Sequence, residues 1–293
     1  MQKENKPLSS VELLKISAEY LASMGIENAR LDAEVLLADI LGVDRIKLYV
    51  DYDRTLLNDE LIAYRHAIAK RARRMPLAYI TGHKEFMSLN LFVKEGVLIP
   101  RPDTETLIEI VEEYITRRQL NEPGILDLCT GSGAVACALA SIFPKASIKA
   151  VDISPIACEV AEKNAFNLGF KERIEILQGD LYKALKEERK FDVIVTNPPY
   201  IPSEMLEELQ PEVSNYEPRL ALDGGIKGMD LIETIISESM RYLKPSGMLA
   251  LEIGDDIQAR ATCELIKGIN MVNVNIAKDL SGLDRVVSGE DGS

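Results

Sequence analysis

Residues 191–200 read FDVIVTNPPY. The first five residues form a short, β-branched apolar run, which predicts a buried strand. The two prolines remove two backbone donors and fix φ twice, and Asn197 before them is biased toward extended geometry. The prolines alone do not decide between an ordinary strand-ending turn with a surface Tyr200 and a functional edge. Together, however, these residues form a rigid edge with free carbonyl oxygens, one side-chain amide and one aromatic face, which suits a planar amino group.

A second motif, DLCTGSGA, occupies residues 127–134 and follows another predicted strand. Its candidate cofactor-binding residues are Cys129, Thr130, Gly131, Ser132 and Gly133. The two glycines allow the backbone to approach a ligand where a Cβ would collide. Asp152 follows Gly133 by 19 residues, and a carboxylate at that distance can accept both hydroxyls of a ribose. Asp180, after the third strand, either accepts from an adenine amino group or caps the following turn.

The same loop also fits a dinucleotide-binding pattern. Residues 131–136 read GSGAVA, which satisfies G-x-G-x-x-A with an acidic residue at about the expected distance. A dehydrogenase needs an acid, a base or a hydride-handling group beyond this loop. The edge at residues 197–200 supplies none of them and no catalytic His follows it, so the sequence disfavours hydride transfer.

Composition restricts the class of protein. The 293 residues are 46% apolar, which supports a well-filled core, and no apolar run reaches membrane-spanning length. Residues 1–10 are polar and lack the core of a signal peptide. The four cysteines show no C-x-x-C spacing and there are only two histidines. We therefore expect reduced thiols, no metal site and a cytoplasmic location.

The net charge of −13 comes from one part of the chain. Residues 1–85 carry 13 basic and 13 acidic side chains, whereas residues 86–293 carry 21 basic and 34 acidic ones. Tight nucleic-acid binders neutralise several phosphates with Lys and Arg. The acidic second part therefore favours a protein or small-molecule substrate.

The predicted elements divide the chain into three parts. We expect a small helical domain over residues 1–80, a connector with a β-hairpin over 81–102, and a catalytic domain over 103–293. From residue 125 short apolar runs alternate with helical spacing, which predicts an α/β fold with a doubly wound, mostly parallel sheet. The strands are expected at 125–129, 147–151, 174–177, 191–196, 248–253, 271–276 and 284–287. Helices are expected from about 104 to 118 and at 134–143, 155–168, 230–243 and 256–267, the first of them capped by Asp103 or Thr104.

The third long helix of the front domain is expected from about 58 to 75 and ends in a cluster of cations. Its members are Lys70, Arg71, Arg73 and Arg74. Cations suit the C-terminus of a helix, so the cluster is either a solvated helix end or a docking patch for an acidic partner.

With these motifs in view, the chain resembles the release-factor glutamine methyltransferases, the HemK or PrmC family. The resemblance spans nearly the whole chain and rests on PLAYITG at 76–82, IPRPDTE at 99–105, the glycine loop, NPPY at 197–200, EP at 217–218, AL at 221–222, GG at 224–225 and residues 279–285. NPPY is shared with methyltransferases that act on bases. The PRPDTE stretch and the helical front end are more particular to this family.

The resemblance implies a Rossmann-like methyltransferase domain with a seven-stranded sheet, preceded by a substrate-docking domain. It implies transfer of a methyl group from S-adenosylmethionine to the side-chain amide nitrogen (N5) of the glutamine in the Gly-Gly-Gln loop of peptide chain release factors, with S-adenosylhomocysteine as product. The implied cofactor-binding residues are Cys129, Thr130, Gly131, Ser132, Gly133, Asp152, Asp180, Leu181 and Asn197. The implied substrate-binding residues are Arg101, Asn197, Pro198, Pro199 and Tyr200.

Three of these residues are implied to be catalytic. The side-chain oxygen of Asn197 and the carbonyl oxygen of Pro198 would accept the two amide hydrogens, and Tyr200 would pack against the amide plane. Positioning and electrostatic stabilisation would then carry the rate.

The chain departs from the family at two positions, and rival functions stay open. Cys129 stands where the family usually has Gly, and Leu181, followed by Tyr182, stands where an aromatic often lies beside the adenine. The rival enzymes methylate a glutamine of a ribosomal protein, or N6 of adenine or N2 of guanine in nucleic acid. The non-enzymatic rival is a cofactor-binding scaffold. We expect a monomer that binds neither membranes nor, stably, nucleic acid.

Overall fold

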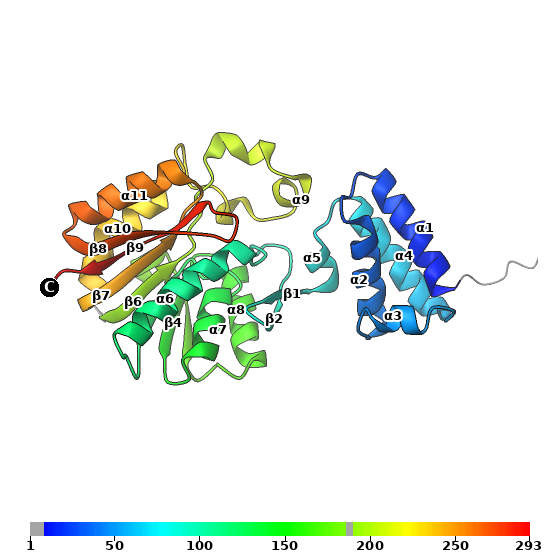
Figure 1. Ribbon diagram of the computed structural model, residues 1–293, viewed down its shortest axis with the longest axis horizontal. Helices are drawn as coiled ribbons and strands as arrows, with labels where there is room; N and C mark the ends of the chain where they lie inside the picture. Colours follow the sequence, from blue (N-terminus) through cyan, green and yellow to red (C-terminus); the bar gives the residue numbers. More distant parts are fainter. Residues whose placement is uncertain (1–8, 186–189) are drawn as a thin grey trace, which may run out of the picture. The chain divides into compact units, whose positions relative to one another are not determined.

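The computed structural model describes residues 9–185 and 190–293 (Figure 1). Residues 1–8 lie outside the described residues, and they make up most of the polar stretch that is expected not to be a signal peptide. The chain forms two compact units. The helical unit comprises Met1–Gly82 with Pro211–Tyr216, and the sheet unit comprises His83–Gln210 with Glu217–Ser293.

The helical unit is built from short amphipathic helices around one apolar core. Its helices are α1 (Ser10–Ser23), α2 (Ala29–Leu41), α3 (Lys47–Val50), α4 (Asn58–Ala72), α5 (Leu77–Thr81) and the short α9 (Pro211–Ser214). Ser9 caps α1 in a capping box with Glu12. Gly42 ends α2 in the left-handed conformation, at φ 63°. Leu21, Leu36, Leu37 and Tyr64 are almost completely buried in the core.

The cations at the end of α4 differ in exposure to solvent. Arg71 is buried, and its Nε donates to Asp32 Oδ2 at 2.6 Å. Its Nη1 and that of Arg74 donate to Glu212 Oε1 at 3.0 and 3.1 Å. The solvated helix end is therefore wrong for Arg71, because the acidic partners that neutralise it lie far away in sequence, and the docking patch stays a prediction. Lys70 and Arg73 are exposed.

The sheet unit confirms the seven-stranded, mostly parallel sheet. A hairpin of β1 (His83–Phe86) and β2 (Leu89–Phe92) precedes it. The main strands are β3 (Gly124–Leu128), β4 (Ser147–Asp152), β5 (Ile174–Gln178), β6 (Phe191–Thr196), β7 (Leu243–Glu252), β8 (Met271–Lys278) and β9 (Asp284–Asp291). Their order is β5-β4-β3-β6-β7-β9-β8, and β9 runs antiparallel to both of its neighbours.

Helices cover both faces of this sheet (Figure 1). The helices α6 (Glu105–Arg117), α7 (Ala134–Ile142) and α8 (Pro155–Asn167) cover one face, and α10 (Asp230–Tyr242) and α11 (Asp256–Gly268) cover the other. Short 3-10 turns occur at Pro102–Thr104, Leu181–Ala184, Ser203–Glu208 and Arg219–Ala221. Buried Ile, Leu, Val and Ala residues fill the space between helices and strands. This close packing makes the sheet rigid, so the loops at its strand ends start from fixed positions.

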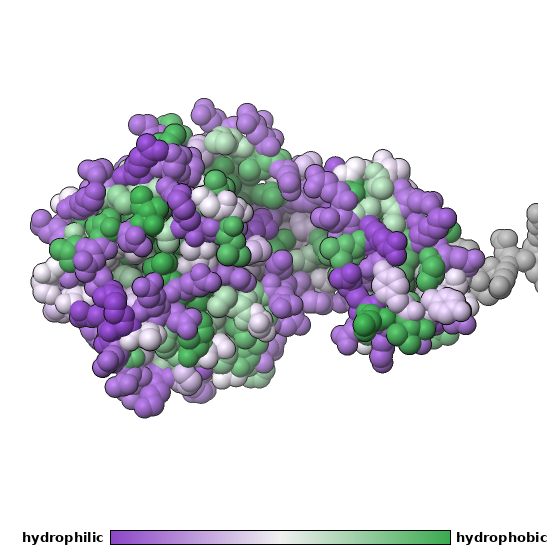
Figure 2. Space-filling view, viewed as in Figure 1, coloured by the Kyte–Doolittle hydropathy of each residue, from purple (hydrophilic) through white to green (hydrophobic). Residues whose placement is uncertain are grey.

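Hydrophilic side chains dominate the visible face of the sheet unit, with hydrophobic ones in small, separate areas (Figure 2). Across residues 9–185 and 190–293, no helix is long and apolar enough to cross a membrane. The four cysteines are free thiols, and three of them are buried.

Candidate active site

Strand register brings the two sequence motifs to one edge of the sheet. Leu128 of β3 lies beside Thr196 of β6 on one side and Val151 of β4 on the other. These strands are parallel, so the glycine loop, Asp152 and Asn197 all leave from their carboxyl ends. The residues there line one pocket of the sheet unit.

The pocket contains most of the residues that the sequence singled out. Those that line it are Arg101, Cys129, Thr130, Gly131, Ser132, Asp152, Asp180, Leu181, Asn197 and Pro199. Gly133, Pro198 and Tyr200 are not among its lining residues. The structure therefore brings ten of the predicted positions together in the pocket, and the other three are neighbours of lining residues along the chain.

The glycine loop uses its small residues in different ways. A Cβ on Gly131 would meet no atom within 4 Å, so open space lies beside the backbone there. A Cβ on Gly133 would lie 3.1 Å from the Cβ of Ala161, so this glycine lets the loop pack against α8. Cys129 adopts φ 58°, a left-handed conformation that costs a non-glycine residue about 1 kcal/mol. A glycine would adopt this conformation without that cost.

Asp127, just before the loop, is a site residue that the sequence reasoning did not assign. It is almost fully buried, and the Thr130 hydroxyl donates to its Oδ2 at 2.6 Å. Burial raises the pKa of Asp127 to about 7, against the opposing effect of the hydrogen bonds from Thr130 and the backbone of Ala136. Asp127 thus anchors the glycine loop through Thr130. Its position near the end of a strand, just before the glycines, was the available signal.

Asp152 lines the pocket and also holds the loop. Its Oδ2 accepts from the Gly131 backbone N–H at 2.8 Å, and its Oδ1 accepts from the Ser154 N–H at 2.9 Å. Burial raises the pKa of Asp152, although these backbone hydrogen bonds oppose the shift. Each carboxylate oxygen has a further lone pair for a ligand hydroxyl.

Asp180, the third acidic residue, does not play one of the two roles expected for it. Asp180 makes no side-chain cap to the following turn, so the capping alternative is wrong. Its Oδ2 accepts instead from Lys183 Nζ at 2.7 Å. Leu181 is buried in the pocket wall at φ 48°. Tyr182 stacks on Tyr242, with ring centroids 4.5 Å apart, and so the aromatic that follows Leu181 does not replace it at the pocket.

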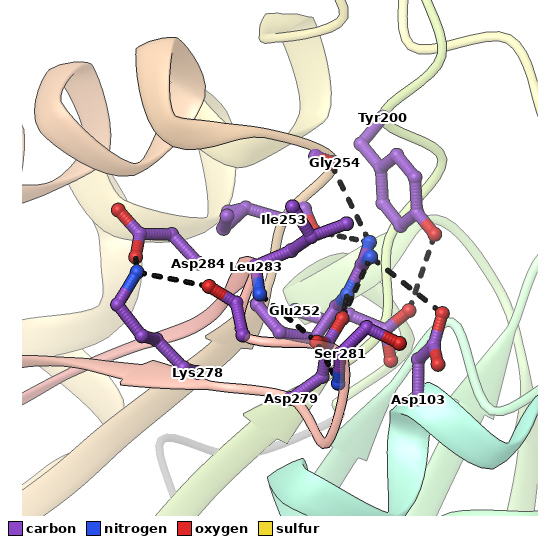
Figure 3. A network of polar contacts seen from close by, with 12 residues as sticks. Asp103, Tyr200, Glu252, Ile253, Gly254, Lys278, Asp279, Ser281, Leu283 and Asp284 are labelled. Carbon is purple, nitrogen blue, oxygen red and sulfur yellow. Dashed lines mark hydrogen bonds and ion pairs between the residues drawn. The ribbon is translucent and has the colours of Figure 1, made fainter.

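Asn197 and Tyr200 are each held by a buried polar side chain. Asn197 Nδ2 donates to Thr104 Oγ1 at 3.1 Å. The Tyr200 hydroxyl donates to Glu252 Oε1 at 3.2 Å, and Figure 3 shows this ring directed at Glu252. Asp103 and Thr104 do not cap α6 with their side chains, so that prediction is wrong, and Thr104 bonds Asn197 instead.

Arg101 enters the pocket wall as part of an ion pair. Its Nη2 donates to Glu217 Oε1, and Glu217 Oε2 accepts from the Ile99 backbone N–H at 3.2 Å. Glu217 is buried, so the pair fixes the guanidinium at the pocket rather than leaving it mobile.

Glu252, at the end of β7, borders a network of polar contacts (Figure 3). Burial raises the pKa of Glu252 to about 7, although Thr104, Arg285 and Tyr200 act in the opposite direction. Asp103 adds a further increase to that pKa. Arg285 Nη2 also pairs with Asp279 Oδ2 at 3.0 Å and faces Asp103 Oδ2 at 3.6 Å.

We expect Glu252→Gln to flatten the pH dependence of stability. Between pH 4.5, the ordinary pKa, and about 7, the native state keeps a proton on Glu252 that the unfolded chain has released. Wild-type stability therefore falls as pH rises through this window, and the glutamine variant lacks that contribution. Denaturant unfolding of both proteins at the two ends of the window measures the difference. Asp127 titrates in both proteins, so its contribution to the difference cancels. If the stability of the two proteins changes equally with pH, the raised pKa assigned to Glu252 is wrong.

Two family models match parts of the chain. The PrmC N-terminal domain matches residues 12–82, and the methyltransferase small domain matches residues 103–209. A protein of Geobacter sulfurreducens named release factor glutamine methyltransferase is 45% identical over 273 residues, which cover 93% of each chain. A protein of the same name from Leptospira interrogans is 42% identical and covers 96% of this chain and 98% of its own.

Solved structures share the fold at lower identity. The hMettl16 catalytic domain in complex with MAT2A 3'UTR hairpin 1 has a TM-score of 0.59 and 15% identity, covering 93% of this chain and 90% of that one. A methyltransferase from Pyrococcus furiosus has a TM-score of 0.51 and 16% identity, covering 81% of this chain and all of its own. At such identities the likeness concerns the fold alone.

Proposed function

The chain belongs to the release factor glutamine methyltransferase family, and we propose that it methylates N5 of the glutamine in the Gly-Gly-Gln loop of peptide chain release factors. The observation that carries the proposal is the convergence of Asn197, the glycine loop and Asp152 on one pocket. A planar amide presented at Asn197 would lie in the same pocket as the cofactor. The family assignment supplies the identity of the substrate.

The pocket residues fit S-adenosylmethionine. Asp152 has lone pairs left for the ribose hydroxyls, and the open space beside Gly131 admits a ligand against the backbone. Asp180 and Leu181 would form the adenine end of the site, and the remaining loop residues Cys129, Thr130, Ser132 and Gly133 would shape its wall. When bound, this cofactor supplies a methyl group carried on a positively charged sulfur.

The protein's part in the reaction is to orient the amide and to meet the charge that develops on it. An amide nitrogen is a weak nucleophile because its lone pair is delocalised into the carbonyl. Asn197 Oδ1 and the Pro198 carbonyl oxygen would accept its two hydrogens and turn the lone pair toward the methyl group. The same two acceptors then stabilise the positive charge on nitrogen, and the surplus proton leaves to water. Tyr200, Pro199 and Arg101 would line the substrate's path.

Mass spectrometry tests this proposal directly. Purified protein and S-adenosylmethionine are incubated with an unmodified release factor, and the Gly-Gly-Gln peptide is sequenced after digestion. We expect one added methyl group on the glutamine side chain. Methyl label found in DNA, RNA or a ribosomal protein, with none on the release factor, would overturn the assignment.

The helical unit is proposed to dock the body of the release factor. Binding energy away from the reacting amide can be used to hold that amide in place, so the full-length factor should be a much better substrate than the isolated peptide. Removing residues 1–82 should erase most of this advantage. The measurement is kcat/KM for both substrates with both enzymes.

The control for that truncation is cofactor affinity, because all residues lining the pocket belong to the sheet unit. Truncation leaves Glu212 without Arg71 and Arg74, and an exposed carboxylate costs little. If the truncated enzyme binds the cofactor normally and still prefers the full-length factor, docking lies elsewhere.

We also propose that the protein is a monomer and lies in the cytoplasm. A cytoplasmic location suits four free thiols, and gel filtration tests the oligomeric state.

A further inference from the structure

The acceptor role of Asn197 depends on which end of its amide faces the pocket. The two ends are similar in size but opposite in hydrogen bonding, since the oxygen accepts and the NH₂ group donates. A substrate amide that presents its own NH₂ group needs the oxygen. The protein must therefore hold the Nδ2 end of Asn197 on the other side.

Thr104 is placed to hold that end. Its hydroxyl oxygen lies 3.1 Å from Asn197 Nδ2, although 93 residues separate the two in sequence. Thr104 is 4% exposed, so water cannot readily replace it. Both residues line the pocket. In this contact the amide NH₂ group of Asn197 donates and the Thr104 hydroxyl oxygen accepts.

Glu252 holds the other end of the 197–200 motif. It is 1% exposed, and its Oε1 accepts from the Tyr200 hydroxyl at 3.2 Å. Asn197 and Tyr200 are thus each anchored by a buried side chain, and Thr104 is the one that contacts Asn197.

We propose that Thr104 is the positioning residue for Asn197. In this arrangement Asn197 Nδ2 is engaged by the protein, and Oδ1 is the end offered to the substrate amide. Two buried side chains hold the two ends of the 197–200 motif, since Thr104 bonds Asn197 and Glu252 bonds Tyr200. The proposal rests on the proposed function, because it concerns the acceptor used for a glutamine amide.

A set of Thr104 variants tests it. Thr104→Val keeps the shape but removes the hydroxyl, and it should lower kcat for release-factor methylation about tenfold, the effect of one lost hydrogen bond. Thr104→Ser restores the hydroxyl and should stay within about threefold of wild type. Calorimetry should give the same S-adenosylmethionine affinity for all three proteins.

A double-mutant cycle separates positioning from a general structural effect. In an Asn197→Ala background there is no amide to orient, so adding Thr104→Val should lower kcat no further. A full additional tenfold loss, equal losses in the valine and serine variants, or weakened cofactor binding would each overturn the proposal. Thermal melting establishes folding, and Thr104→Ala takes the place of the valine variant if that one is unfolded.

The proposed function and this inference fail in different ways. A wild-type protein that does not methylate the release factor contradicts the proposed function. A wild-type protein that does so, together with a fully active Thr104→Val variant, contradicts the role of Thr104 alone.

Discussion

Asn197→Ala is expected to lower kcat by roughly two to three orders of magnitude while leaving S-adenosylmethionine affinity nearly unchanged. The side-chain oxygen of Asn197 is one of two proposed acceptors for the amide hydrogens, and the positive charge builds on the nitrogen between them. Its loss acts mainly on the transition state, where that charge is largest. Single-turnover methylation of the release factor and calorimetry of the cofactor measure the two quantities separately.

An asparagine outside the pocket provides the matched control. Asn167 is exposed at the end of α8, and its replacement by Ala should change neither kcat nor affinity. Near-normal turnover in Asn197→Ala would rule out the acceptor role. A large loss of cofactor affinity would instead make Asn197 a binding residue for the cofactor.

The sequence predicted the sheet well because its signals are local. Short β-branched runs and glycine-bounded helices follow from the period of the apolar residues, and most predicted boundaries lie within a residue or two of the observed ones. The exceptions are β7 and β9, which are longer than expected. Pro245 and Gly247, residues that favour turns, lie in the first half of β7, yet Leu243 before them pairs with Phe191 of β6. Pairing with a neighbouring strand overrides such local signals.

The site was predictable where a motif carries the chemistry and not where distant residues meet. The glycine loop, Asp152 and Asn197 follow strand ends, and parallel pairing gathers strand ends at one edge. Thr104 looked like a helix cap because its local sequence is that of a cap. Its contact with Asn197, and that of Tyr200 with Glu252, span 93 and 52 residues, and no periodic pattern encodes contacts of this kind.

The two departures from the family pattern illustrate a further limit. Cys129 and Leu181 both have positive φ, at 58° and 48°, although a side chain normally disfavours this region. The resemblance to the family marks them as unusual residues but not as strained ones. Such strain is commonly found beside ligand sites and persists when the surrounding structure enforces it. Here Asp127, through Thr130, and Asp152, through Gly131, hold the loop that contains Cys129.

Asp152→Ala is expected to weaken S-adenosylmethionine binding tenfold or more. A charged acceptor contributes roughly 1.5–3 kcal/mol per hydrogen bond in a favourable setting, and the ribose offers two hydroxyls. The structure adds a second source of loss, because Asp152 also accepts from the backbone N–H groups of Gly131 and Ser154. The alanine variant therefore loses the proposed ribose contacts and the anchor of the glycine loop together.

An analogue of the cofactor that lacks both ribose hydroxyls separates these two contributions. Wild type should bind the analogue tenfold or more weakly than S-adenosylmethionine, since Asp152 then has nothing to accept from. Asp152→Ala should bind both ligands with nearly equal affinity, because the partner of the hydroxyls is gone. Any weakening that the variant shows for the analogue itself, relative to wild type, measures the loop. If the variant still prefers the ribose hydroxyls as strongly as wild type does, Asp152 acts only through Gly131 and Ser154, and another residue must bind the ribose.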